Sequence, residues 1–128
     1  PLPEAQLDRF FFKLELTSPA VDALVTIFER TTESSTQAVS AIVSGDEILQ
    51  MRALAREVPI AQPLMVWVAR LIRSTHPQAD DAPDFVRAYL RYGASPRGGQ
   101  AIILAAKVRA LAAGRYHVAP EDIEGVVK

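Results

Sequence analysis

The sequence predicts an all-α fold, a small helical bundle, for this chain of 128 residues. Three observations support this prediction. Apolar residues recur at helical spacing in several separate stretches, most clearly at Leu64, Trp67, Val68, Leu71 and Ile72. Capping residues or proline stand before most of these stretches, and glycine or proline follows several of them. Short loops join the stretches, as is usual for helices that pack against one another in a bundle.

The first 43 residues are expected to be less regular than the rest. Residues 4–8 look like the end of a helix, and the alternation of apolar residues from Phe10 to Leu16 predicts one short strand without neighbouring strands. The sequence Thr17-Ser18-Pro19 then signals the start of a helix, whose apolar stripe is Val21, Leu24, Val25 and Phe28. Residues 31–43 are rich in Ser, Thr and Gln, which favours a linker.

Five helical stretches are expected after this linker. The residues expected to open them are Ser44, Pro63, Asp84, Ser95 with Pro96, and Pro120. The short helix after Asp84 is expected to bury Phe85, Val86, Tyr89 and Leu90, and the long helix after Ser95 to end near Gly114. The apolar stripes predict a core centred on Trp67, Leu71, Leu104 and Val108.

Composition and charge exclude several classes of protein. The chain is 49% hydrophobic and 23% charged, as in ordinary globular domains. A net charge of -1 lacks the basic excess of a nucleic-acid-binding surface, so no nucleic-acid partner is expected. The chain has no cysteine, and His76 and His117 are too far apart to suggest a metal site, so none is predicted. No apolar run could span a bilayer, and we expect a cytoplasmic protein without membrane contact.

The most informative motif is residues 93–99, which read G-A-S-P-R-G-G. Ser95 is a good N-cap and Pro96 suits the first helical position, which places Arg97 in the first turn. A cation is unfavourable there, because the helix dipole attracts anions to that end. The arginine makes sense if a bound phosphate completes the site, and the alternative is an ordinary surface arginine.

Four segments of the chain resemble MoxR-type AAA+ ATPases in their order and spacing. They are residues 2–10 (L-P-E-A-Q-L-D-R-F), 93–97 (G-A-S-P-R), 105–115 (A-A-K-V-R-A-L-A-A-G-R) and 116–123 (Y-H-V-A-P-E-D-I). In that family the second segment belongs to a helical lid and carries the arginine called sensor 2. The resemblance therefore implies that Arg97 contacts the phosphates of a nucleotide, together with Ser95 and Gly98.

The resemblance also implies roles for the residues around these motifs. Gly98 and Gly99 would leave room for a phosphate, although alanine near these positions is more typical of the family. Arg9, in the D-R-F segment, looks like an arginine finger that acts in trans on the nucleotide of a neighbouring subunit. The alternative role for Arg9 is a partner for Asp8 or Glu4 at the end of the first helix.

The same resemblance implies the organisation of the parent protein. Residues 1–43 are expected to be the end of an ATPase core plus a linker, and residues 44–128 the helical lid. The parent would be a chaperone-like ATPase that uses ATP and Mg²⁺ in a ring, expected to be a hexamer. Its partners would be its own core, the neighbouring subunits and a von Willebrand A domain protein, and the sequence does not identify the client.

The sequence also contains no G-x-x-x-x-G-K-[ST] phosphate loop. The chain reads as a C-terminal fragment, which we expect to be inactive by itself and to hold no cofactor. Two alternatives remain open at this stage. One is a self-sufficient helical module that binds a partner peptide, and the other is a helix-turn-helix-like DNA binder, which the near-zero net charge disfavours.

Overall fold

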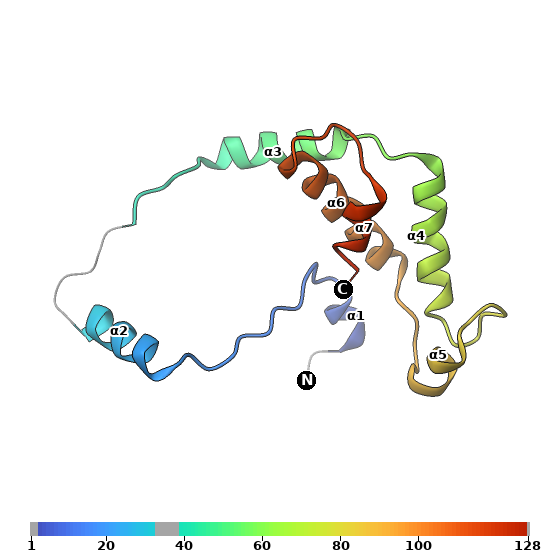
Figure 1. Ribbon diagram of the computed structural model, residues 1–128, viewed down its shortest axis with the longest axis horizontal. Helices are drawn as coiled ribbons and strands as arrows, with labels where there is room; N and C mark the ends of the chain where they lie inside the picture. The colour runs from blue at the N-terminus through green and yellow to red at the C-terminus, as the bar shows by residue number, and fades with distance from the viewer. Residues whose placement is uncertain (1–2, 33–38, 128) are drawn as a thin grey trace.

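The computed structural model of the protein describes residues 3–32 and 39–127 and contains seven helices there (Figure 1). Their bounds are α1 Glu4–Leu7, α2 Val21–Thr32, α3 Gly45–Glu57, α4 Gln62–Ser74, α5 Asp84–Tyr89, α6 Pro96–Ala112 and α7 Pro120–Glu124. No strand forms within the described residues. The all-α prediction is confirmed, and each expected helix is present.

Helix α6 is the centre of the packed part of the molecule. It packs against α3, α4 and α7, and the buried core lies between these helices. The core residues are Val58, Val68, Ala106, Ala110, Val118 and Ile123. Several of the α6 positions that face its neighbours are alanine or glycine, so the neighbouring backbones approach it closely.

The core differs from the predicted one at two of its four residues. Leu71 and Leu104 are half-buried, but Trp67 is 38% exposed and Val108 is 53% exposed. The true inner face of α4 passes through Val68, which is 2% exposed, one position beyond Trp67. Helix α6 is apolar on nearly all sides, so periodicity alone pointed to its large side chains, whereas the buried side is made of small ones.

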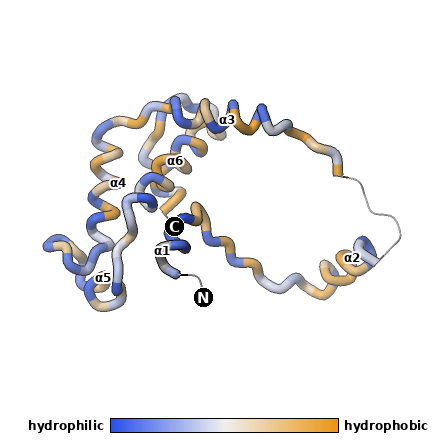
Figure 2. The backbone as a smooth tube through the Cα atoms, turned by 180° about the vertical axis from the view of Figure 1, so that it is seen from behind, coloured by the Kyte–Doolittle hydropathy of each residue, from blue (hydrophilic) through white to orange (hydrophobic). Residues whose placement is uncertain are grey.

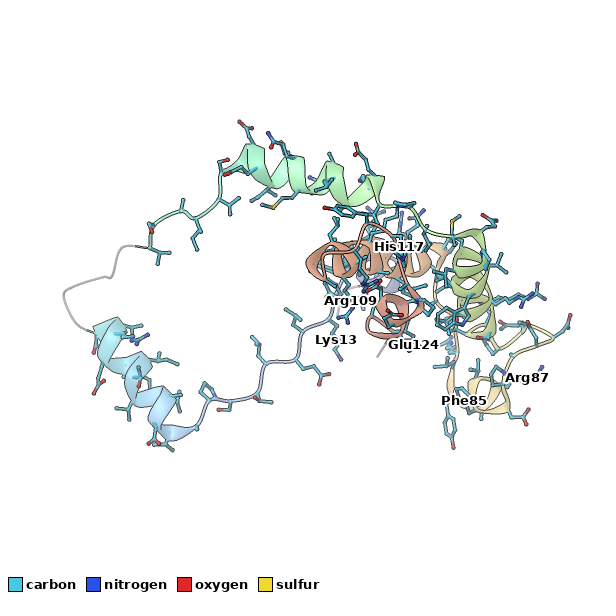
Figure 3. The ribbon with its side chains drawn as sticks, turned by 45° about the horizontal axis from the view of Figure 1, so that its top comes forward. Lys13, Phe85, Arg87, Arg109, His117 and Glu124 are labelled. Carbon is cyan, nitrogen blue, oxygen red and sulfur yellow. The ribbon has the colours of Figure 1, made fainter. Side chains whose placement is uncertain are left out.

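The prediction for α5 was right about the helix and wrong about most of its buried residues. Val86 is buried, whereas Phe85 is 65% exposed and points away from the bundle (Figure 3). Tyr89 and Leu90 are also exposed. A helix of six residues offers one turn to its neighbours and therefore buries little.

Residues 10–32 and 39–43, called the arm below, extend away from the packed helices and carry α2 (Figure 1). Residues 10–20 are extended and exposed, so the predicted strand from Phe10 to Leu16 does not form, because no neighbouring strand is present to pair with it. None of the residues of α2 is buried, and hydrophobic residues follow one another along the arm (Figure 2). Residues 33–38 of the predicted linker lie outside the described residues.

The ends of the helices follow the sequence signals closely. Ser44 caps α3 in a reciprocal capping box with Glu47, and the hydrogen bonds from Ser44 to this carboxylate lower the pKa of Glu47. Gly114 follows the end of α6 with a φ of 71°, the left-handed conformation that favours glycine. This turn directs the chain back along α6 toward α7.

Helix α7 is fixed by a buried ion pair. The Arg115 guanidinium donates two hydrogen bonds to the carboxylate of Asp122, at 2.7 and 2.6 Å. Asp122 is 2% exposed and also accepts a hydrogen bond of 2.9 Å from the backbone N–H of Ala119. The hydrogen bonds from Arg115, aided by the one from Ala119 and by the charges of Arg115 and Arg109, lower the pKa of Asp122 in spite of its burial. Arg109 projects from α6 beside α7 (Figure 3).

Candidate site at the start of helix α6

The first turn of α6 begins as the motif predicts. Ser95 is the N-cap, and its hydroxyl accepts a hydrogen bond of 3.1 Å from the backbone N–H of Arg97. The backbone N–H of Gly98 donates to the carbonyl oxygen of Ser95 at 2.9 Å. Both N–H groups of the first turn therefore already have partners inside the chain, so a phosphate here would depend on side chains more than on the backbone.

An aspartate from the other end of the chain occupies the position expected for an anion. The Ser95 hydroxyl donates a hydrogen bond of 2.5 Å to Oδ1 of Asp8, and Nη1 of Arg97 lies 3.4 Å from Oδ2 of the same carboxylate. The side chains are partly open to solvent, at 56% exposed for Arg97 and 32% for Asp8. This carboxylate offsets the unfavourable position of the arginine at the positive end of the helix dipole.

The residue before the cap is held by the end of α4. The backbone N–H of Ala94 donates a hydrogen bond of 2.8 Å to Thr75 Oγ1, and Nε2 of His76 donates one of 3.0 Å to the Ala94 carbonyl oxygen. The ring of His76 lies against Gly93 so closely that a Cβ at Gly93 would overlap it. The N–H and the carbonyl oxygen of Ala94 are thus both bonded to residues at the end of α4, which fixes the start of α6 there.

The two glycines after Arg97 face α4, where they allow close packing. A Cβ on Gly99 would lie 3.2 Å from Cγ1 of Ile72, a tight contact, and Gly99 is buried. A Cβ on Gly98 would make only ordinary contacts, 3.6 Å from Ala94 and 3.7 Å from Ile72. Close crossing of α4 and α6 therefore accounts for Gly99, and room for a phosphate is not needed to explain it.

Arg9 lies next to this site in sequence. Its side chain is exposed, and no ion pair of Arg9 is found among the side chains that the structure describes. The structure shows Asp8 in contact with Ser95 and Arg97, and no hydrogen bond between Asp8 and Arg9 is found within the described residues. The side chain of Glu4 lies outside the described part of the chain, so the alternative in which Glu4 is the partner of Arg9 stays a prediction.

Sequence reasoning did not assign Asp8, Thr75 or His76 to the site. Asp8 stands inside the D-R-F motif, but nothing in the sequence signals a contact between residues 87 positions apart. Beside the site is a hollow of about 330 Å³, and Asp8 and Arg97 are the charged residues that line it. Within the described ranges, no cluster of His, Asp and Glu could hold a metal ion, and no helix is long and apolar enough to cross a membrane.

Comparisons with known proteins show what the chain is similar to. Residues 82–128 match the family model of the AAA lid domain. The chain is 33% identical over 127 residues to the chaperone MoxR1 of Mycobacterium tuberculosis, covering 99% of this chain and 33% of the relative. It is also 27% identical to the uncharacterized protein YeaC of Bacillus subtilis, covering 97% of this chain and 36% of the relative.

A solved structure supports the same assignment. The chain superposes with a TM-score of 0.83 on a crystal structure from Cytophaga hutchinsonii, described as a candidate ATPase, with 32% identity. The match covers 98% of this chain and 38% of that one. This chain carries an AAA lid domain of the MoxR type. It spans about a third of the length of the curated relatives that it matches.

Proposed function

We propose that this chain is the C-terminal lid region of a chaperone-like MoxR-type AAA+ ATPase, in which Arg97 is the sensor-2 arginine. Residues 44–128 are the lid, which closes over the nucleotide bound to the core of its own subunit. Residues 1–43 are the end of that core and the connection to the lid. In this proposal Arg97 contacts the γ-phosphate of ATP and adds positive charge where the transition state needs it.

The observation that carries this proposal is the carboxylate held at the start of α6. Asp8 is bound there by the Ser95 hydroxyl and by Arg97, which supports a site for oxygen anions built from these two side chains. A phosphate offers the same kind of oxygen with more charge, and arginine binds it through two parallel N–H groups. In this proposal Gly98 has no side chain to obstruct a phosphate at the first turn, while Gly99 lets that turn lie close to α4.

The other roles follow from the same assignment. Arg9 acts in trans as an arginine finger on the nucleotide of the neighbouring subunit, in a ring that we expect to be a hexamer. ATP and Mg²⁺ are bound by the core of the parent protein, where Mg²⁺ neutralises phosphate charge, and this chain alone holds neither. The parent is a cytoplasmic protein that works with its neighbouring subunits and with a von Willebrand A domain protein.

The test is steady-state ATP hydrolysis by the full-length protein that carries this chain. Arg97→Ala should lower turnover on the order of a hundredfold, because one positioned donor to the transition state has an effect of that size. Arg97→Lys should restore only part of it, since lysine keeps the charge but loses the planar guanidinium. The matched control is Arg73→Ala, which removes an arginine that is 63% exposed and paired with Asp81 at 3.3 Å, far from α6 in sequence.

Two results would contradict the proposal. Unchanged turnover in Arg97→Ala would make this arginine an ordinary surface residue. Measurable ATP hydrolysis by the 128-residue chain alone would show a catalytic site that the proposal does not contain.

A second candidate function is a helical module that binds a partner peptide. It is favoured by an apolar groove of about 840 Å³ between α3, α6 and the arm, lined by Phe12, Met51, Leu54 and Val108 among others. In this alternative Met51→Lys would abolish the action on the partner and leave ATP turnover intact. No comparable observation favours the DNA-binding alternative, and the net charge of -1 disfavours it.

A further inference from the structure

We propose that Asp8 is an internal competitor for phosphate at the start of α6, and that phosphate binding there releases the segment that carries Arg9. This inference rests on the proposed function, since it concerns the regulation of the same site. It adds a role for Asp8 and a link between the two arginines.

The contacts of Asp8 are suited to a reversible hold. Its carboxylate has one short contact, 2.5 Å to the Ser95 hydroxyl, and one long contact, 3.4 Å to Arg97. Arg97 is more than half exposed, and pairs of this kind contribute only about 0.2–1 kcal/mol. The hold is therefore weak enough for a competing anion to displace it.

A phosphate would compete for the same two donors. The first-turn N–H groups are already bound within the chain, so the available donors are the Arg97 guanidinium and the Ser95 hydroxyl. Asp8 uses the hydroxyl and one nitrogen of the guanidinium. Because Arg97 is 56% exposed, a phosphate can reach its guanidinium from solvent. Carboxylate and phosphate carry the same sign of charge, so the two cannot share the donors without strong repulsion.

Displacement of Asp8 has a direct consequence for its neighbour in sequence. Arg9 is the next residue, and α1 ends at Leu7, only one residue before Asp8. While Asp8 is bound to α6, the position of Arg9 is tied to the lid. Once a phosphate takes the place of Asp8, Arg9 is released to reach the neighbouring subunit. Binding at one nucleotide site then affects the nucleotide site of the next subunit.

The experiment measures phosphate binding by the 128-residue chain at constant ionic strength. Inorganic phosphate and pyrophosphate are titrated while the backbone amide signals of Arg97 and Gly98 are followed by NMR. The variants are wild type, Asp8→Asn, Asp8→Asn with Arg97→Ala, and the control Asp81→Asn, which loses the same charge from a similar exposed pair with Arg73.

We expect Asp8→Asn to bind both ligands about fivefold more tightly than wild type, the equivalent of about 1 kcal/mol. Asp81→Asn should match wild type, and the double variant should lose the gain. In wild type, the amides from Gln6 to Arg9 should become more mobile as the ligand binds, with the same midpoint as the shift at Arg97.

The possible failures are distinguishable. If wild type and Asp8→Asn bind equally, or if residues 6–9 stay ordered at saturation, the competitor role is wrong while the phosphate site stands. If no variant, including Asp8→Asn, shows a shift at Arg97 with either ligand, the phosphate site of the proposed function is wrong and the competition with it. If Asp81→Asn raised the affinity for phosphate as much as Asp8→Asn does, the change would come from net charge alone and the competitor role of Asp8 would be wrong.

Discussion

The helix α6 has an arginine–aspartate pair near each end, and the two pairs differ in burial and geometry. Near its C-terminus, Arg115 binds a carboxylate that is 2% exposed through two bonds of 2.6 and 2.7 Å. At its N-terminus, Arg97 lies 3.4 Å from a carboxylate whose side chain is 32% exposed. Water can replace the partner of Arg97 but cannot reach Asp122. The buried pair therefore holds the fold, whereas the exposed pair can change partners during function.

The largest expected effect is the loss of the buried pair. Asp122→Asn should lower the free energy of unfolding by about 1.5–3 kcal/mol, because Arg115 and the backbone N–H of Ala119 lose their hydrogen bonds to a charged acceptor. Urea denaturation measures this loss. The matched change Asp81→Asn, at an exposed pair, should cost less than about 1 kcal/mol. Equal losses in both variants would remove the contrast between buried and exposed pairs.

Acid should weaken the buried pair in a predictable window. The pKa of Asp122 is lowered from its ordinary value of 3.8, chiefly by the hydrogen bonds from Arg115. A carboxyl whose pKa is depressed in the folded state contributes stability that is fully present above its unfolded pKa and is lost as the pH falls through its folded pKa. The difference in melting temperature between wild type and Asp122→Asn should thus be constant from pH 7 to about 5 and shrink below pH 3.8. A difference that grew on acidification would contradict the assigned direction.

A smaller effect is expected for His76, which holds Ala94 beside the cap of α6. His76→Leu leaves the carbonyl oxygen of Ala94 without its donor, which should cost about 1 kcal/mol in unfolding experiments. His76→Gln keeps an N–H donor and should recover part of this loss. His117, which is exposed, provides the control His117→Leu, for which we expect almost no change. Equal effects of the two leucine variants would argue against a special role of the bond to Ala94.

The smallest expected effect is that of removing the arm together with Asp8. A chain that begins at residue 44 should unfold cooperatively, with a free energy within about 1 kcal/mol of the whole chain, since exposed pairs contribute no more than this. The reason is that the arm contributes none of the core residues. Differential scanning calorimetry of both chains gives the comparison, and loss of a cooperative transition in the shorter chain would show that residues 1–43 belong to the same folding unit.

The sequence predicted the helices well, because their signals are local. Ser44, Ser95 and Gly114 act within one turn of their own positions, and all three stand where they were expected. The buried faces were predicted less well, because Trp67 and Val68 are adjacent on α4 and only the packing against α6 decides which of them points inward. The strand from Phe10 to Leu16 was wrong for a related reason, since a strand depends on partners that local sequence does not supply.

The residues of the candidate site also fall into those with a local sequence signal and those that reach the site through long-range contacts. Ser95 and Arg97 were predicted, because the cap and the proline fix the register of the first turn. Asp8 and His76 reach that turn across 87 and 18 residues, and no local pattern records such contacts. The misplaced charge of Arg97 favoured an anion at this position, with an ordinary surface arginine as the alternative. It could not predict that the chain supplies one itself.

The buried pair also has a mechanical consequence for α6. With 17 residues, this helix is a rod about 26 Å long. Its C-terminal end is held by Gly114, Arg115 and Asp122, so this end acts as the pivot of a lever whose opposite end carries Arg97. A tilt of about 5° at the pivot moves the opposite end by about 2 Å, since the rise per residue sets the length of the arm. Gly99 packs tightly against α4, and Ala94 is hydrogen-bonded to the end of that helix. A tilt of α6 would therefore move α4 with it, and the two helices would move as one rigid unit.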